Sequence, residues 1–285
     1  MCCKKNRMVD NNITTVKTVP TYLKWVHKQL RQGHIDVKYK DAFFRGQASR
    51  KWTLKPQVFR TGKNEFKLLQ QAQMLAWNEL SDCKSSLEKL VKFQHYGLCT
   101  RLLDVTMNPL VALYFATETY NNEDGCVYWG ETHGWNHVEQ ASIIADIVFS
   151  LELQWPIDLE RISQLTKAKG YTYPDDIIKK AISNPCFFYP PQNNARIIAQ
   201  NGAFLMAPII NNNEEPINDF DFKDGNNNIF NNNIAVIKSG YKEKIREELS
   251  FYGVHRAMLF PGIDSKMDYI NKSIPNTPKL NIKPI

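Results

Sequence analysis

Apolar positions recur along the chain with two periods, and each period predicts one type of element. Leu23, Val26 and Leu30 lie three and four residues apart, which places them on one face of a predicted helix over residues 21–32. Helix start signals or a similar apolar spacing predict further helices at residues 64–80, 85–97, 175–183 and 242–251, and from residue 108 onward.

Short apolar runs bounded by polar or turn residues predict strands instead. They occur at residues 41–46, 100–103, 126–129, 143–149, 203–206, 234–238 and 257–260. Because helices and strands alternate without a regular strand–helix–strand rhythm, the pattern favours the α+β class over a doubly wound sheet. We therefore expect one domain with a mixed, mostly antiparallel sheet and flanking helices.

Two segments fall outside this pattern. Residues 1–18 are predicted to be a flexible tail, which leaves residues 19–285 as a single domain. Residues 211–233 are rich in asparagine and poor in aliphatic side chains. Such a segment buries little apolar surface, so we expect a polar, exposed loop there and not a part of the core.

Composition narrows the class of protein. The chain has 285 residues, of which 43% are hydrophobic and 23% charged, as is usual for soluble globular proteins. No apolar run approaches the roughly 20 residues of a membrane-spanning helix, so no membrane partner is expected. The six cysteines form no Cys-x-x-Cys pair, and no secretory signal is visible. These features favour reduced thiols and a cytoplasmic location.

The positive charge is concentrated near the N-terminus. The whole chain has a formal charge of +7, whereas residues 1–60 hold 14 basic and 3 acidic residues. A basic region of this kind suits a polyanionic partner, such as a nucleic acid, or a ligand that carries phosphate. It is equally consistent with a solvated surface.

The segment Phe43–Gln47 places an arginine between aromatic residues and a glycine. The guanidinium of Arg45 can make a forked, charge-assisted contact with a phosphate or hold a ribose. Gly46 lets a ligand approach the backbone closely. The alternative is a structural arginine at the end of a strand, paired with an internal carboxylate such as that of Asp104.

A second segment, Phe93–Ala116, gathers polar side chains around one predicted strand and its turns. They are His95, Thr100, Arg101, Asp104 and Thr106. Asn108 and Pro109 then start a helix whose free N–H groups form a natural anion site. The alternative is that Arg101 and Asp104 form an internal ion pair that locks the turn.

Other histidines and cysteines carry weaker signals. His133 and His137 have H-x3-H spacing with Cys126 nearby, but Gly134 and Asn136 disfavour the helix that would bring the two rings together. No metal site is therefore expected.

His95 and Cys99 lie close together in the sequence. His95 either contacts a ligand or exchanges protons with it, or it donates to a backbone carbonyl in a structural role. Cys99 stands between apolar residues, which favours a small buried hydrophobic side chain over a nucleophile.

Together the two polar segments resemble the FRG domain family, which is named for its Phe-Arg-Gly tripeptide. The family pattern is matched at Phe44–Gln47, Gln94–Gly97, Thr100–Asp104, Asn108–Pro109 and Ala112–Ala116. Cys99 and Val105 stand where the family usually has Pro and Trp. The resemblance is close over residues 38–120 and looser at residues 196–204 and 248–264.

A more distant resemblance links the chain to the three-part site of ADP-ribosyltransferases. It implies NAD as the substrate, with Arg45 on a phosphate or ribose and Thr100 or Thr106 beside the nicotinamide ribose. Gln200 then lies at the third motif, where such enzymes usually carry a glutamate. Because an amide cannot act as a base or stabilise an oxocarbenium ion by charge, catalysis needs His95, Asp104 or a distant glutamate.

Together the residues and the resemblances predict a nucleotide-processing enzyme similar to NAD-dependent ADP-ribosyltransferases. They imply a toxin or defence effector that modifies a nucleic acid or a protein. The predicted catalytic residues are His95, Asp104 and Gln200. The predicted ligand-binding residues are Arg45, Gly46, Gln47, Thr100, Arg101 and Thr106. Arg45 and the segment Thr100–Thr106, together with Gln200, should line one cleft.

Two other classes of function stay open. One is a non-catalytic module that binds a nucleotide or nucleic acid through the basic N-terminal quarter. The other is a scaffold in which Arg45 and Asp104 are purely structural. An open cleft in which a carboxylate accompanies Arg45 and Gln200 favours the enzyme.

Overall fold

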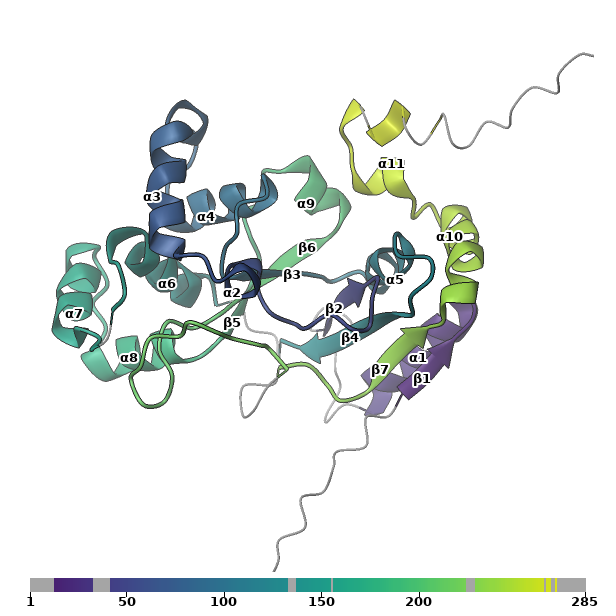
Figure 1. Cartoon of the computed structure of the whole chain (residues 1–285), viewed down its shortest axis with the longest axis horizontal. Helices are drawn as coiled ribbons and strands as arrows, with labels where there is room; N and C mark the ends of the chain where they lie inside the picture. Colours follow the sequence, from purple (N-terminus) through teal and green to yellow (C-terminus); the bar gives the residue numbers. More distant parts are fainter. Residues whose placement is uncertain are drawn as a thin grey trace, which may run out of the picture.

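One open sheet runs through the part of the chain that the computed structural model describes, which is residues 13–32, 42–132, 137–154, 156–223, 229–263, 265–267 and 270. The strands are β1 (Ile13–Val16), β2 (Ala42–Gln47), β3 (Leu102–Thr106), β4 (Gly125–Glu131), β5 (Cys186–Phe188), β6 (Gly202–Met206) and β7 (Ile234–Ile237). They lie in the order β1-β7-β4-β2-β3-β6-β5 (Figure 1). Only β1 and β7 pair in parallel among these strands, which confirms the predicted α+β class with a mostly antiparallel sheet.

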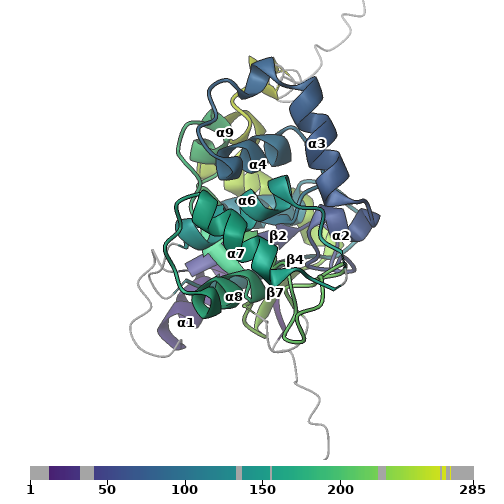
Figure 2. The ribbon, with the colours of Figure 1, turned by 90° about the vertical axis from the view of Figure 1, so that its left-hand side faces the viewer.

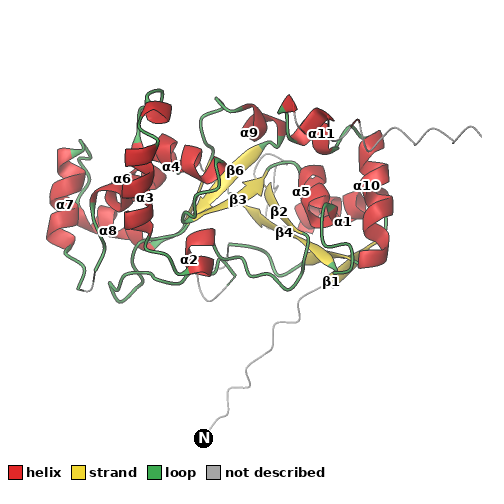
Figure 3. Ribbon diagram, turned by 45° about the horizontal axis from the view of Figure 1, so that its top comes forward, coloured by secondary structure: helices red, strands yellow, loops and turns green. Residues whose placement is uncertain are grey.

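Helices pack on one face of the sheet in two groups. The groups lie on either side of the strands in Figure 3, and Figure 2 is viewed from the side of the second group. The first group is α1 (Val19–Gln32), α5 (Pro109–Thr117) and α10 (Lys242–Phe251), over β2, β4 and β7. The second group is α3 (Glu65–Leu75), α4 (Ser86–His95), α6 (Val138–Ser150), α7 (Leu159–Ala168) and α8 (Asp175–Ser183), beside β3, β5 and β6. The short elements are α2 (Gln57–Thr61), η2 (Asn78–Leu80), α9 (Ala195–Ala199), η4 (Ser239–Tyr241) and α11 (Arg256–Leu259). The space between the two groups is where the candidate site lies.

The strands are apolar on both sides because both faces of the sheet are covered. Side chains alternate along a strand, so neighbours point to opposite faces. Phe44 and Trp129 pack under the helices, whereas Phe43 and Tyr128 pack on the other face. The runs of buried residues that predicted strands in the sequence are therefore the centre of the molecule.

Three predicted helix starts are confirmed by the interactions that make them. The side chains of Asn64, Ser85 and Asn108 accept hydrogen bonds from the N–H groups of Lys67, Glu88 and Leu110, at 3.0, 3.2 and 2.9 Å. Each cap satisfies a backbone donor that the helix itself leaves unpaired.

Two predicted strands are wrong. Residues 143–149 lie in α6, and residues 257–259 lie in α11. α6 is apolar on nearly all sides because it lies inside the second group of helices, so its apolar run carries no clear helical period. The expectation of a tail over residues 1–18 is also wrong at residues 13–16, which form β1, while residues 1–12 lie outside the described residues.

The asparagine-rich segment 211–233 is not simply an exposed loop, as its composition predicted. Phe220, Phe222 and Phe230 are buried and pack on the face of the sheet opposite the two groups of helices. Residues 224–228 lie outside the described residues. Aromatic side chains at three positions thus give this polar segment a place in the core.

Among the described residues, no helix combines the length and the apolar character needed to cross a membrane.

Candidate functional site

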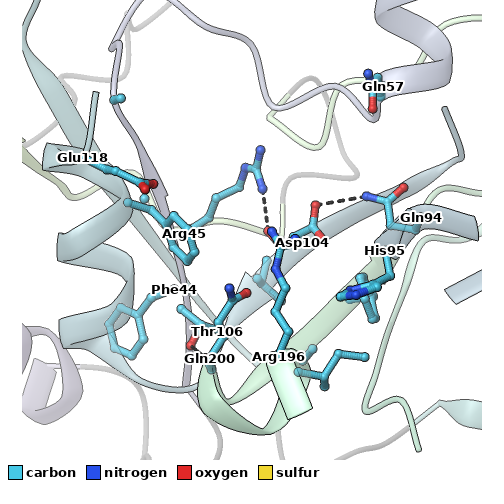
Figure 4. Close-up of a pocket in the computed structure, with 18 of the residues that line it drawn as sticks. Phe44, Arg45, Gln57, Gln94, His95, Asp104, Thr106, Glu118, Arg196 and Gln200 are labelled. Atoms are coloured by element: carbon cyan, nitrogen blue, oxygen red, sulfur yellow. Dashed lines mark hydrogen bonds between the residues drawn. The ribbon is translucent and has the colours of Figure 1, made fainter. Parts of the chain in front are cut away.

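A cavity of about 380 Å³ lies on the helix-covered face, between the two groups of helices (Figure 4). Phe44 and Phe115 come from the side of α5, and Ile197 and Phe204 come from the side of α4 and α6. We call this cavity the Arg45 pocket. Its charged and polar lining includes Arg45, His95, Asp104, Thr106, Glu118, Arg196 and Gln200.

The pocket forms where the pairing of the two central strands ends. β2 and β3 are paired only at Phe44 and Thr106. Beyond that pair the Nη1 atom of Arg45 donates to the backbone carbonyl of Asp104 at 2.5 Å. A side chain thus bridges β2 and β3 beyond their backbone pair, and its guanidinium lies at the pocket.

Arg45 brings an incompletely satisfied charge to the pocket. Its Nε atom is buried without a hydrogen-bond partner, and no carboxylate of the described residues forms an ion pair with it. Burial lowers the pKa of Arg45, and the negative charge of Asp104 opposes this effect. Since an arginine keeps its proton in proteins, a cation with free donors faces the cavity.

The structural alternative for Arg45 was an ion pair with Asp104. Arg45 contacts the backbone carbonyl of Asp104 and not its carboxylate. That carboxylate accepts a hydrogen bond from Gln94 Nε2 at 3.0 Å instead. Both residues line the same pocket, as predicted, but the contact between them leaves the charge of Arg45 without a direct ionic partner.

Gly46 lines the pocket, but the packing of α5 explains why it has no side chain. A Cβ atom on Gly46 would lie 1.8 Å from the backbone oxygen of Ala112 in α5. Gln47 does not line the pocket: it is buried, and its Nε2 donates to the carbonyl of Thr53 at 3.0 Å. The structure therefore places Gln47 outside the pocket, although its neighbours Arg45 and Gly46 line it.

Thr100 does not line the pocket but contacts Gln94, which does. It is fully buried, and its hydroxyl donates to Gln94 Oε1 at 2.6 Å. Gln94 in turn donates to the carboxylate of Asp104. Thr100 thus fixes the amide of Gln94 without lining the pocket, which corrects the prediction that it does.

Arg101 also lies outside the Arg45 pocket, contrary to prediction. It is buried against Glu65 of α3, with Nη2 2.7 Å and Nε 2.8 Å from Glu65 Oε2. Its Nη1 donates to the carbonyl of Pro208 at 2.8 Å. The alternative of an ion pair with Asp104 is wrong as well, since the partner of Arg101 comes from 36 residues earlier in the chain.

Thr106 and Gln200 meet at the floor of the pocket. The hydroxyl of Thr106 donates to the carbonyl of Gln200 at 2.6 Å and accepts from the N–H of Asn108 at 3.0 Å. The side chain of Gln200 donates to the carbonyl of Leu259 at 3.1 Å. The structure thus brings the predicted third-motif residue to the predicted hydroxyl residue, although 94 positions separate them.

His95 lies half-buried at the end of α4, between a cation and an anion. Burial lowers the pKa of His95, the charge of Arg196 lowers it further, and the charge of Asp104 raises it. The net effect favours the neutral ring at neutral pH. A neutral imidazole can accept a proton, so the predicted acid–base role has a suitable environment.

Sequence reasoning missed two charged residues of the pocket. Glu118 accepts from the Nη1 of Arg256 at 2.6 Å and from the hydroxyl of Tyr114 at 3.3 Å. Arg196 stacks on the ring of Phe260, with 4.8 Å between guanidinium and ring centre. Glu118 follows the apolar run of α5 and has no motif around it, so nothing in the sequence distinguishes it from a surface glutamate.

The predicted anion site at the start of α5 is not part of this pocket. Asn108 already caps the helix by accepting from the N–H of Leu110. The pocket is lined instead by the other end of the helix and the residues after it, at Phe115, Glu118 and Thr119.

His133, one of the two histidines considered as metal ligands from their spacing, lies outside the described residues. Within the described ranges, no group of three or more His, Cys, Asp or Glu side chains gathers in a way that could hold a metal ion.

Comparison with known protein families finds a match for one segment of the chain. Residues 40–125 match the family model of the FRG domain. No curated protein and no solved structure matches the chain. The matched segment supplies Arg45, His95, Asp104 and Glu118, whereas Arg196 and Gln200 come from beyond it.

Proposed function

Since the chain contains an FRG domain, as its motifs predicted, we propose that it is a nucleotide-processing enzyme that uses NAD in the manner of ADP-ribosyltransferases. One observation carries this proposal. A partly buried arginine faces the pocket with an unpaired Nε and with no carboxylate of the described residues as its partner. Such a cation gains most from an anionic ligand, because the protein itself leaves its charge uncompensated.

The binding step uses the two arginines of the pocket. The guanidinium of Arg45 binds a phosphate of the ligand through two N–H groups. Arg196 of α9, which also lines the pocket, supplies a second positive charge. A diphosphate carries the two anionic groups that two separated guanidinium groups can hold. The cavity of about 380 Å³ falls within the range of small-molecule sites.

The third motif carries Gln200 in place of a glutamate, so the chemical step uses a carboxylate from another part of the pocket. Cleavage breaks the bond between the ribose C1′ and the nicotinamide nitrogen, and the bonding electrons leave with nicotinamide. The carboxylate of Glu118 stabilises the positive charge that develops on the ribose. A nucleophile of the acceptor then bonds to C1′ and gives its proton to neutral His95.

The alternative of a non-catalytic binder that uses a basic face has less support. Lys51 and Lys55 of the basic N-terminal quarter are paired with Glu123 and Asp219, at 3.1 and 2.6 Å. Arg45 lies in a pocket and not on an open face. The purely structural alternative requires an ion pair between Arg45 and Asp104, and the contact goes to a backbone carbonyl.

Calorimetric titration with NAD and an assay for released nicotinamide test the proposal. Arg45→Ala should lose NAD binding while melting at the wild-type temperature, and Arg45→Lys should bind about ten- to a hundredfold more weakly than wild type. Arg50→Ala is the matched control, because Arg50 is an exposed arginine in the loop that follows β2 and lies outside the pocket. It should bind as wild type does.

A second pair of variants separates binding from chemistry. Glu118→Gln should keep NAD affinity but release nicotinamide about a hundredfold more slowly. Asp104→Asn tests the rival carboxylate. If the wild-type protein binds no NAD, or if Arg45→Ala binds it as tightly as wild type, the proposed function is wrong.

A further inference from the structure

Two exposed aromatic side chains stand together at the mouth of the Arg45 pocket. Trp52 lines the pocket and is 39% exposed, and Tyr120 beside it is 57% exposed. Their rings meet edge to face, with centroids 5.0 Å apart and planes at 89°. Large aromatic rings in this position leave apolar surface in contact with water, and neither the fold nor the proposed chemistry accounts for them.

The backbone beneath these rings is held by a buried lysine. Lys242 of α10 is fully buried, and its ammonium group donates to the carbonyls of Ala48, Thr119 and Tyr120 at 2.6, 2.8 and 2.8 Å. All three donors of the ammonium group are therefore used. The ammonium group of Lys242 therefore hydrogen-bonds to both the loop after β2 and the loop after α5.

Two further contacts join the loops. The N–H of Arg50 donates to the carbonyl of Asp124 at 2.7 Å, and Lys51 pairs with Glu123 at 3.1 Å. Tyr120 also has a φ of +53°, a conformation that costs energy in a bulky residue. The two loops that carry the exposed aromatic pair are thus joined to each other, with Tyr120 in a strained conformation, beside a pocket that contains a cation without an ionic partner among the described residues.

We propose that Trp52, supported by Tyr120, is the surface on which a planar heteroaromatic ring of the ligand stacks while the ligand's phosphate lies on Arg45. This inference rests on the proposed function, because it places the ring relative to the phosphate. A flat ring of this kind is part of both halves of NAD, as adenine or as nicotinamide. An aromatic ring held rigidly in advance loses little conformational freedom when the ligand stacks on it.

Binding of three phosphate compounds tests this proposal. AMP and nicotinamide mononucleotide each carry one of the two rings, and ribose 5-phosphate carries none. Trp52→Ala should weaken binding of at least one ring-bearing compound about tenfold or more, and leave binding of ribose 5-phosphate unchanged. The compound that is affected identifies the ring. Trp52→Phe, which keeps a flat ring, should stay within about threefold of wild type.

Trp77→Ala is the control, because Trp77 is 75% exposed and lies outside the pocket. The stacking proposal is overturned if Trp52→Ala binds every compound as wild type does, or if it loses ribose 5-phosphate to the same extent as the ring-bearing compounds. Both of these results leave the proposed function standing, since wild type still binds. If wild type binds neither NAD nor any of the three compounds, the proposed function fails, and the stacking surface fails with it.

Discussion

Arg45 and Arg101 have similar settings in the sequence and opposite environments in the structure. Both are basic residues within polar islands of the FRG domain. Arg101 is enclosed with Glu65 and donates to backbone carbonyls, so its charge is compensated within the protein. Arg45 has no ionic partner among the described residues. Whether a buried arginine is structural or binds a ligand is therefore decided by its partners and not by its motif.

The pKa of His95 provides a test of the electrostatics of the pocket. The pKa of His95 lies below its ordinary value because of burial and the positive charge of Arg196, and Asp104 opposes the shift. Arg196→Gln should therefore raise the pKa of His95, and Asp104→Asn should lower it further. Titration of the His95 ring protons by NMR measures both directions. An unchanged pKa in Arg196→Gln would show that the guanidinium does not face the ring.

The same shift links pH to stability with a definite sign. The folded protein holds the pKa of His95 below the unfolded value of about 6.5, so the unfolded state binds more protons between these two pH values. The contribution of His95 to stability is fully present above about pH 6.5. It is lost as the pH falls toward the folded pKa.

At the scale of helices and strands, local signals in the sequence were sufficient where the interactions themselves are local. Asn64, Ser85 and Asn108 cap their helices through contacts two or three residues away, and all three helix starts were predicted. β1 was missed because its described backbone partner is β7, more than 200 residues later. Its four residues alone carry no pattern that distinguishes them from a tail.

The residues of the candidate site likewise fall into those that a local sequence signal predicts and those that depend on contacts between distant segments. Arg45, His95 and Asp104 were found because they belong to motifs in one stretch of sequence. Glu118 and Arg196 were missed because their role depends on the meeting of α5, α9 and α11, which no spacing along the chain reveals.

The segment between β6 and β7 shows how composition can mislead about an element, and it gives a prediction. Phe222 is fully buried and meets Phe220 edge to face, with centroids 5.0 Å apart. Phe222→Ala should lower the free energy of unfolding by about 3–5 kcal/mol, because it removes a buried ring and leaves a cavity. Urea unfolding measures the difference.

Asn212→Ala in the same segment is the control. Asn212 is exposed, so this change should stay within about 0.5 kcal/mol of wild type. If Phe222→Ala unfolds at the wild-type urea concentration, the segment is the exposed loop that its asparagines suggest.

At the scale of the whole molecule, the FRG domain match defines the centre of the sheet and not a complete folding unit. Residues 40–125 contain β2 and β3, which pair with each other only at Phe44 and Thr106. β2 pairs along its whole length with β4, and β3 pairs along its whole length with β6. β6 lies entirely outside the match, and β4 lies outside it except for Gly125.

This arrangement predicts that a fragment of residues 40–125 does not fold alone. Without β4 and β6 the two central strands lose almost all their backbone partners. The apolar side chains of α5 then lose the cover that α1 and α10 provide. Too little apolar surface stays buried to offset the conformational entropy of the fragment. A fragment of residues 13–270, which keeps every described element, should melt at the temperature of the full chain. Circular dichroism and the dispersion of amide signals in NMR distinguish the two fragments. A cooperative thermal transition in the fragment of residues 40–125 would show that the matched segment is an independent domain, with the flanking strands and helices added around it.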